Sequence, residues 1–352
     1  MATFAVDGGF RYVVPDSLDG ITLGSLVRVP LAGRRTRGFV TEVLADGDPD
    51  NLRPLLGKVG DLPVLTPRLI ETMRWAAVHY VAPFAVLLAK AVPPNAPRRI
   101  AIAPAMAAAA SPPVGATSGP PAAGLAASIA AGSRVRPQYL VGGGPWGRLI
   151  AELAGPVLAA GRSAAVIGPT VLEATALAAQ LEAARGVAPW LATSSAPARE
   201  TTRAWAAPLS APGQLVVGTR EIALWPLGDL ALTVVVEEGR AAMKSPQTPT
   251  LAVRDLVRRR AAAERFTVVF AGAVPTVETM VTGVELSEPT ARVWPLVEVI
   301  DRAEEPPGGG VLMQAAVLAI AAVAKGGGRS FVFVTRSGEA AALRCIQCGV
   351  LR

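Results

Sequence analysis

Cysteine, histidine and long apolar runs are all scarce in this 352-residue chain, and each scarcity excludes a class of protein. The two cysteines lie near the end of the chain, which argues against a disulfide-stabilised secreted protein and agrees with a reducing compartment. The single histidine, His79, has no cysteine or histidine close to it in the sequence. It is therefore interpreted as structural rather than as a metal ligand.

Membrane and export signals are missing as well. No run of about 18 strongly apolar, uncharged residues occurs, although 51% of the residues are hydrophobic, so we expect no membrane partner. The N-terminal residues MATFAVDGGFRY lack a basic segment followed by an apolar one. Because a secretory signal needs both, the expected location is the cytoplasm.

Positive charge is in excess, with 34 Lys and Arg residues against 27 Asp and Glu residues and a formal net charge of +7. Basic side chains that neutralise phosphates release counterions, so this excess favours nucleic acid as a partner. A general arginine bias of the proteome is the alternative, in which the charge has no binding role.

Residues 1–97 are predicted to form a small β-rich domain. Short strands are expected at 11–15, 26–30 and 38–44, and a helix at 66–80. Between two strands, residues 31–37 are expected to form a basic hairpin tip that carries Arg34, Arg35 and Arg37. Three guanidinium groups on one short loop repel one another, so the loop is interpreted either as a phosphate contact or as a solvated turn.

Residues 98–138 are rich in Ala, Pro and Gly and are interpreted as a linker. No acidic residue occurs between Glu71 and Glu152, whereas several arginines do. The linker is therefore weakly basic, and it is interpreted either as a segment that follows a nucleic-acid backbone or as a connection without contacts.

Strands and helices alternate across residues 139–305. The expected helices are 147–160, 171–184 and 251–263, and the expected strands are 163–168, 215–218, 230–236 and 265–271. This alternation predicts an α/β fold in which helices cover both faces of a parallel sheet and ligands bind at the carboxyl ends of the strands. The apolar strand 230–236 ends in Glu237 and Glu238, interpreted either as active-site groups or as the point where a buried strand meets water.

A glycine-rich segment, LVGGGPWGRL at 140–149, has the outline of a phosphate-binding loop. Gly142 and Gly147 match the two glycines of G-x-x-x-x-G-K-[ST], but Arg148 replaces the lysine and Leu149 replaces the hydroxyl residue. A chance run of glycines is the alternative, because 35 residues of the chain are glycine.

Cys345 and Cys348 form a C-x-x-C followed by glycine, a spacing that presents two thiolates to one metal ion. A structural zinc site needs four ligands, and the chain ends soon afterwards. The pair is therefore interpreted as half of a zinc site in a fragment, as an unmetallated knuckle or as a redox pair.

Taken in order along the chain, these landmarks resemble the replication-restart helicases of the primosomal protein N-prime (PriA) family. The N-terminal elements that carry the resemblance are Phe10–Pro15, Val27–Leu31, Gly38–Val40, Leu52–Leu55, Trp75–Tyr80 and Ala91–Pro94. The helicase-type elements are Gly168–Thr170, Val217–Ala223, Val236–Gly239, Arg254–Asp255, Gly272–Thr276, Thr335–Gly338 and Cys345–Gly349. Relative to the family the chain looks truncated at its C-terminal end.

The resemblance implies four parts. Residues 1–97 would bind the 3′ end of a nascent DNA strand, 98–138 would be the linker, 139–305 a RecA-like helicase lobe, and 306–352 the start of a second lobe with the first zinc knuckle. Together with the basic loop, it places DNA contacts at Phe10, Arg11, Tyr12, Ala32, Arg34, Arg35 and Arg53. Arg53 replaces a lysine of the family, and Arg11 stands where the family commonly has an aspartate.

The resemblance also identifies what the lobe has lost. Leu149 and Val236 replace the hydroxyl and the carboxylate that hold Mg²⁺ in the family, and Arg148 lacks the compact ammonium of lysine. Two losses on one metal ion predict that hydrolysis is gone and that ATP binding is doubtful. Glu237 then remains as a remnant of the group that orients the attacking water.

The predicted function is replication restart: recognition of stalled forks and help in reloading the replicative helicase, without helicase activity of the chain itself. The expected partners are forked and single-stranded DNA, primosome and helicase-loading proteins, and single-stranded DNA-binding protein. One alternative is an active ATP-dependent 3′–5′ DNA helicase with unconventional motif residues. Another is a general scaffold without preference for forks.

Overall fold

The structure is a computed structural model and describes residues 8–45, 51–93, 120–287, 297–301 and 312–333. Two compact units divide between Ala291 and Arg292. The described part of the second unit includes helix α9 (Gln314–Lys325), and all other elements belong to the first. The boundaries that the sequence suggests at residues 97, 138 and 305 stay predictions.

The chain begins with a small set of strands. They are β1 (Tyr12–Val13), β2 (Leu26–Leu31), β3 (Arg34–Phe39), β4 (Arg53–Pro54) and β5 (Gly57–Val59). An antiparallel sheet has the order β3-β2-β5, and β1 pairs with β4 in parallel. The β-rich character predicted for this region is confirmed.

The position of the second hairpin strand was predicted wrongly. The strand expected at 38–44 is β3 at Arg34–Phe39, so the arginines lie in a strand rather than in a loop. Leu31 pairs with Arg34, which leaves Ala32 and Gly33 as a two-residue turn with φ of 49° and 74°. Positive φ at both positions is the type I′ geometry whose twist matches the hairpin.

Two helices follow, α1 (Pro67–His79) and α2 (Phe84–Lys90). The Thr66 hydroxyl accepts the Leu69 N–H, and proline occupies the first helical position, as the sequence predicts for the start of this helix. One face of α1 is buried, including Leu69 and Met73.

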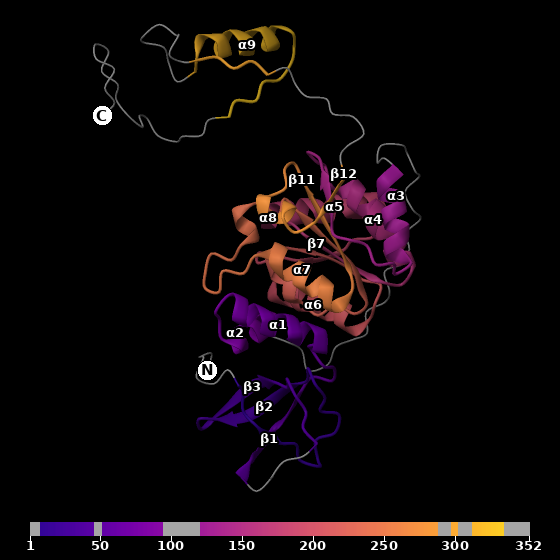
Figure 1. Cartoon of the computed structure of the whole chain (residues 1–352), viewed down its shortest axis with the longest axis vertical. Coiled ribbons are helices and arrows are strands. Elements are labelled where there is room, and N and C mark those ends of the chain that lie inside the picture. Colours follow the sequence, from indigo (N-terminus) through magenta and orange to yellow (C-terminus); the bar gives the residue numbers. More distant parts are fainter. Residues whose placement is uncertain (1–7, 46–50, 94–119, 288–296, 302–311, 334–352) are drawn as a thin grey trace, which may run out of the picture. The chain divides into compact units, whose positions relative to one another are not determined.

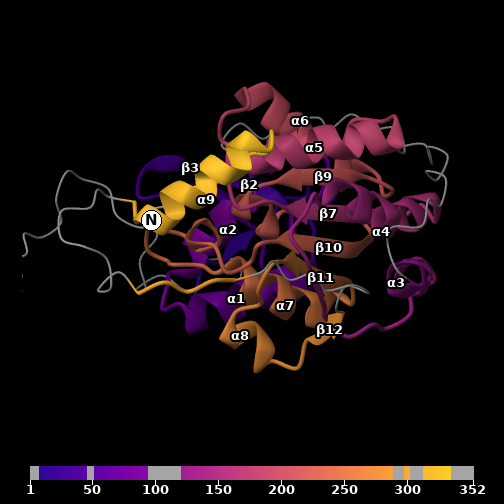
Figure 2. The same ribbon diagram turned by 90° about the horizontal axis from the view of Figure 1, so that it is seen from above.

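The centre of the first unit is a seven-stranded parallel sheet with the strand order β12-β6-β11-β10-β7-β9-β8. The strands are β6 (Gln138–Val141), β7 (Ser163–Ile167), β8 (Trp190–Ala192), β9 (Leu215–Gly218), β10 (Leu230–Val236), β11 (Thr267–Gly272) and β12 (Glu285–Ser287). Every residue of β10 is buried, as expected for a central strand covered on both faces. Figure 2 shows β9, β7, β10 and β11 side by side.

Helices cover both faces of this sheet, which confirms the α/β expectation. They are α3 (Pro120–Ala130), α4 (Gly147–Ala159), α5 (Val171–Arg185), α6 (Ala198–Ser210), α7 (Val253–Glu264) and α8 (Val277–Met280), with short 3₁₀ turns η3 (Arg220–Leu224) and η4 (Ala241–Met243). One hydrophobic cluster holds α3, α4 and α5 against one face of the sheet.

Helix α3 corrects the interpretation of 98–138 as a linker throughout. Its residues Ala126 and Ile129 are buried in the same cluster as α4, at 2% and 1% exposure. Alanine has the highest helix propensity, and the prolines precede or open the helix, where they are tolerated. Residues 94–119 of this stretch lie outside the described residues.

A second hydrophobic cluster joins the N-terminal helices to the other face of the sheet. It contains Leu69 of α1, Leu87 of α2, Trp205 of α6 and Leu256 of α7. The indole N–H of Trp205 donates to the Ala91 carbonyl at 2.8 Å, in a fully buried hydrogen bond. Helices α1 and α2 thus lie between the N-terminal strands and the helices of the sheet (Figure 1).

No helix in the described ranges is long and apolar enough to cross a membrane.

Gly24 offers a test of the N-terminal packing. It has φ of +85°, and a Cβ there would lie 1.9 Å from the Leu65 carbonyl oxygen. Gly24→Ala is expected to lower the free energy of unfolding by about 2–5 kcal/mol, because both backbone strain and overlap oppose it. Gly33→Ala is the matched control, since its φ is +74° and nothing lies within 4 Å, so only the strain of about 1–2 kcal/mol remains. Equal decreases in the free energy of unfolding of the two variants, measured by urea denaturation, would contradict this packing.

Candidate nucleic-acid interface and nucleotide site

The predicted 3′-end pocket lies where β1, β4 and the β2–β3 hairpin meet. Tyr12 pairs with Arg53 in the parallel register of β1 and β4, and its hydroxyl donates to the Pro30 carbonyl at 3.3 Å. Burial raises the pKa of Tyr12, against the opposing effect of the Arg53 charge. Phe10 precedes this strand with 53% of its surface exposed. An exposed aromatic ring next to a guanidinium group can stack on a base and contact its phosphate.

The remaining predicted contacts surround this point. Ala32 is exposed at the tip of the hairpin, and Arg11 is exposed directly before β1. Arg34 and Arg35, both exposed, open β3 directly after the turn. Tyr12 therefore lies next to both Arg53 and the β2–β3 hairpin.

The hairpin register separates the arginines onto two faces. Arg28 pairs with Arg37, and Arg35 pairs with Pro30, so Arg28, Arg35 and Arg37 share one face of the hairpin. Arg34 pairs with Leu31 on the opposite face, where Val29 is buried. Basic side chains that share one face of a hairpin can contact the phosphates of one DNA strand.

Arg28 was not among the predicted contacts. The signal that could have found it is the turn: a two-residue turn at Ala32 and Gly33 sets a register in which Arg28 faces Arg37. The loop predicted from the sequence spans residues 31–37, and a loop of that length does not define this register.

The predicted phosphate loop connects β6 to α4 and ends at Gly147, the first residue of that helix. The Gly147 N–H donates to the Gln180 side-chain oxygen of α5 at 2.9 Å. A Cβ on Gly147 would lie 2.3 Å from the Gln180 Cβ. Glycine at this position is therefore explained by the packing of α4 against α5, and its N–H is already used by a protein acceptor.

Trp146 packs across the same loop. A Cβ on Gly142 would lie 3.3 Å from the indole ring, and one on Gly144 would lie 3.5 Å from the indole nitrogen. Arg148 is exposed on α4, and its Nε lies 3.3 Å from a carboxylate oxygen of Glu152. The loop is thus lined by an aromatic ring, and its arginine is engaged along the helix surface.

Val236 is buried and Leu149 is partly buried, and the resemblance assigns both to positions that hold a metal ion in the family. Val236 belongs to the cluster that holds α4 and α5 against the sheet, and Leu149 packs against that cluster. Together with the Gln180 contact and Trp146, this set of side chains does not fit a magnesium-bound nucleotide, which needs oxygen ligands and free N–H groups.

Two carboxylates follow β10 and have different surroundings. Glu237 has a positive φ of 52°, and its carboxylate accepts the Ala273 N–H at 3.2 Å. The Glu238 side chain is fully buried, and it accepts the Thr276 N–H and the Thr276 and Thr279 hydroxyls at 2.9, 2.9 and 2.8 Å. Glu238 is therefore a structural anchor, while Glu237 remains partly accessible.

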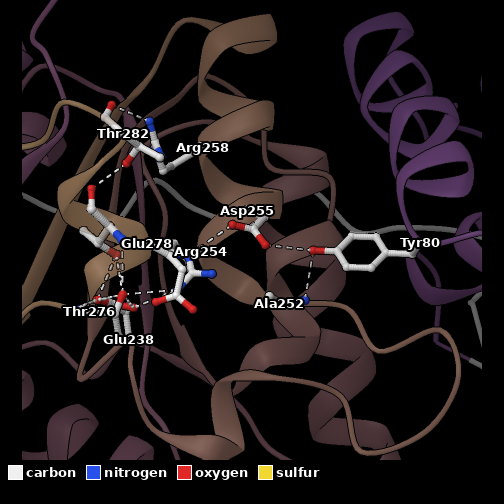
Figure 3. A network of polar contacts seen from close by, with 10 residues as sticks. Tyr80, Glu238, Ala252, Arg254, Asp255, Arg258, Thr276, Glu278 and Thr282 are labelled. Carbon is white, nitrogen blue, oxygen red and sulfur yellow. Dashed lines mark hydrogen bonds and ion pairs between the residues drawn. The ribbon is translucent and has the colours of Figure 1, made fainter.

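A polar chain leads from Glu238 to the N-terminal helices (Figure 3). Arg254 lies 3.7 Å from Glu238 and 3.1 Å from Asp255. Asp255 in turn accepts the Tyr80 hydroxyl at 3.2 Å, and that hydroxyl accepts the Ala252 N–H. The end of the central strand and the end of α1 are thus connected through adjacent residues of α7.

Tyr139 of β6 lies close to the same carboxylates and was not singled out from the sequence. Its ring is fully buried, and its hydroxyl has no hydrogen-bond partner within the described part of the chain. Burial, and the negative charges of Glu238 and Glu237, raise its pKa. The hydroxyl therefore stays protonated at neutral pH.

Cys345 and Cys348 lie outside the described residues, so the zinc prediction stays a prediction. Elsewhere, the described segments contain no group of three His, Cys, Asp or Glu residues that could hold a metal ion.

The contact between Tyr80 and Asp255 predicts a pH effect on stability. Burial is the main cause that raises the pKa of Tyr80 from its ordinary 10.0 to about 12; the hydrogen bond from the Ala252 N–H opposes this shift, and Asp255 adds to it. A raised pKa means that the neutral hydroxyl stabilises the fold fully below pH 10 and loses this effect as the pH rises towards 12. The free energy of unfolding, measured by urea titration, is expected to be about 1 kcal/mol higher for the wild type than for Tyr80→Phe at pH 8. This difference is expected to disappear as the pH rises above 10. A gap that does not change with pH would contradict it.

Comparisons with known proteins agree with the resemblance. The protein-family model of the 3′DNA-binding domain (3′BD) of PriA matches residues 2–93 of this chain. A probable replication restart protein PriA of Mycobacterium tuberculosis is 27% identical over 281 residues, which are 78% of this chain and 43% of that protein. The probable replication restart protein PriA of Deinococcus radiodurans is 33% identical over 47% of this chain and 18% of its own length. The chain thus spans less than half the length of these curated relatives.

Among solved structures, one of Saccharomyces cerevisiae dbp5 bound to nup159, gle1, ip6 and adp is similar with a TM-score of 0.32 and 12% identity. The similarity covers 64% of this chain and 52% of that chain and is too low to support an inference. The family match covers the strands and helices that form the predicted 3′-end pocket, and the relatives extend the similarity into the sheet. The chain is therefore similar to replication restart proteins PriA, and its residues 2–93 match the 3′DNA-binding domain of that family.

Proposed function

We propose that the chain acts in replication restart by binding DNA forks through residues 2–93, and that its sheet does not hydrolyse ATP. The observation that carries the first part is the match of the 3′DNA-binding domain, within which Tyr12 and Arg53 are paired and Phe10 is exposed. The replication restart role is supported by the relatives, which are named replication restart proteins.

The second part is supported by the loop at Gly147. Phosphoryl transfer needs a loop that presents N–H groups and a metal held by oxygen ligands. Here Gln180 accepts the Gly147 N–H, and Val236 and Leu149, which the resemblance aligns with the metal ligands, pack in a hydrophobic cluster. The lobe then serves as a rigid platform for partners rather than as a motor.

The proposal includes partners. At a stalled fork in the cytoplasm the protein would cooperate with single-stranded DNA-binding protein and with primosome and helicase-loading proteins. Loading of the replicative helicase onto a protein-free fork, with and without the purified chain, is the measurement, and equal loading would refute this role.

Fork binding is tested with a labelled fork that carries a free 3′ end and with a plain duplex of equal length. The wild type is expected to prefer the fork at equal salt, and Phe10→Ala is expected to weaken fork binding about tenfold, because a base loses its stacking partner. Phe331→Ala is the control, since Phe331 is 90% exposed and lies in the second unit. The absence of a fork preference in the wild type would refute the proposal.

Hydrolysis is tested by a DNA-stimulated ATPase assay on the wild type and on Glu237→Gln. We expect no turnover above background in either protein, because the metal ligands are apolar. The alternative of an active helicase rests on Glu237, which keeps its place after β10. Turnover that Glu237→Gln abolishes would establish that alternative.

A further inference from the structure

The start of α1 and the end of α7 enclose a cleft of about 180 Å³. Its lining residues are Arg68, Glu71, Arg259, Ala262, Ala263 and Arg265. Three guanidinium groups and one carboxylate leave the cleft with an excess of two positive charges, and two alanines leave room between them. The α1 side belongs to the residues that match the 3′DNA-binding domain, and the α7 side belongs to the sheet.

One carboxylate is shared between two of the arginines. Glu71 lies 3.1 Å from Arg259 and 3.4 Å from Arg68. Arg259 also stacks over the Trp75 ring, with 5.9 Å between guanidinium carbon and ring centre, so it joins α7 to α1. Arg265 has no ion pair with any residue that the structure describes. Of the three arginines in the cleft, Arg68 and Arg265 therefore make the weakest contacts with other protein groups.

Arg68 stands where helix electrostatics disfavours a cation. It is the second residue of α1, and the first turn of α1 contains no acidic residue. The N–H groups of a helix start carry partial positive charge, so an arginine there is repelled and an anion is attracted. An anion bound in the cleft would remove this conflict.

Arg265 stands where the backbone disfavours any side chain. It ends α7 with φ of 64°, in the left-handed conformation that glycine usually adopts at this position. The positive charge suits the end of α7, but a β-carbon does not. Two arginines at locally disfavoured positions on different helices thus converge on one cleft, which is typical of a binding site.

We propose that this cleft binds a phosphodiester group of the DNA backbone. Guanidinium groups match phosphate oxygens with paired hydrogen bonds, and the start of α1 adds partial positive charge. The inference rests on the proposed function, because DNA held by the N-terminal strands supplies the backbone. DNA would then contact both the N-terminal strands and α7, which lies beside α1 (Figure 1).

The test combines Arg68→Gln with Arg265→Gly in the full chain and measures the affinity for the labelled fork across a range of KCl concentrations. Affinity is expected to fall about tenfold near 0.1 M salt, and the slope of log affinity against log salt to fall by about one, since one phosphate contact is lost. An unchanged slope would overturn the inference.

Arg199 provides a matched control. It is exposed and is the second residue of α6, which has 13 residues like α1. Arg68→Gln and Arg199→Gln remove the same charge from the same helical position, so neither is expected to lower the unfolding temperature. Only Arg68→Gln is expected to weaken DNA binding. Equal weakening by both would show a general charge effect and would overturn the inference.

Two further outcomes separate the source of the phosphate and the role of the fork. If inorganic phosphate raises the unfolding temperature of the wild type but not of the double variant, while DNA affinity is equal in both, the cleft takes free phosphate and the inference is wrong. If the wild type shows no fork preference but the salt slope still falls in the double variant, the proposed function fails and the cleft assignment stands.

Discussion

The hydrophobic cluster that α1 and α2 share with one face of the parallel sheet is the constraint on which the first unit depends. It places Leu69 and Leu87 in one core with Trp205 and Leu256, so the N-terminal region cannot separate from the sheet without exposing that core. Burial of apolar surface at about 25 cal/mol per Å² makes such a separation costly. The N-terminal strands are therefore attached to helices whose position against the sheet is fixed by packing. The polar contacts between Tyr80, Asp255 and Arg254 further fix the orientation of α1 relative to α7.

The parts of the fold that local pattern determines were predictable. Strands 215–218 and 230–236 were predicted with the bounds that the structure has, because continuous apolar runs between turn residues leave one interpretation. The β2–β3 turn was missed because Ala32 adopts positive φ, which composition does not reveal. Helix α3 was missed because alanine and proline together suggested a linker, while the packing of Ile129 against α4 depends on tertiary contacts.

The candidate sites were predictable only in part, for a similar reason. The apolar residues Leu149 and Val236, at positions that the resemblance assigns to metal ligands, are visible in the sequence, whereas the contact between Gln180 and Gly147 joins residues 33 positions apart. Arg28 entered the basic face through strand register, and Arg68 and Arg265 met through helix packing. In each case the sequence gives the residue type, but it does not show which residue lies next to it in the fold. Sequence reasoning therefore identified residue types at motif positions better than it identified the surfaces that those residues form.

The hydrogen bond from Gly147 to Gln180 has a thermodynamic consequence. A loop that binds nucleotide gains stability in proportion to RT ln(1 + [L]/Kd), so its fold becomes tied to the nucleotide pool of the cell. Here an internal acceptor already satisfies the donor. A lobe that binds no nucleotide would have a free energy of unfolding that does not depend on the ATP concentration, and its surface would keep the same shape with or without ATP.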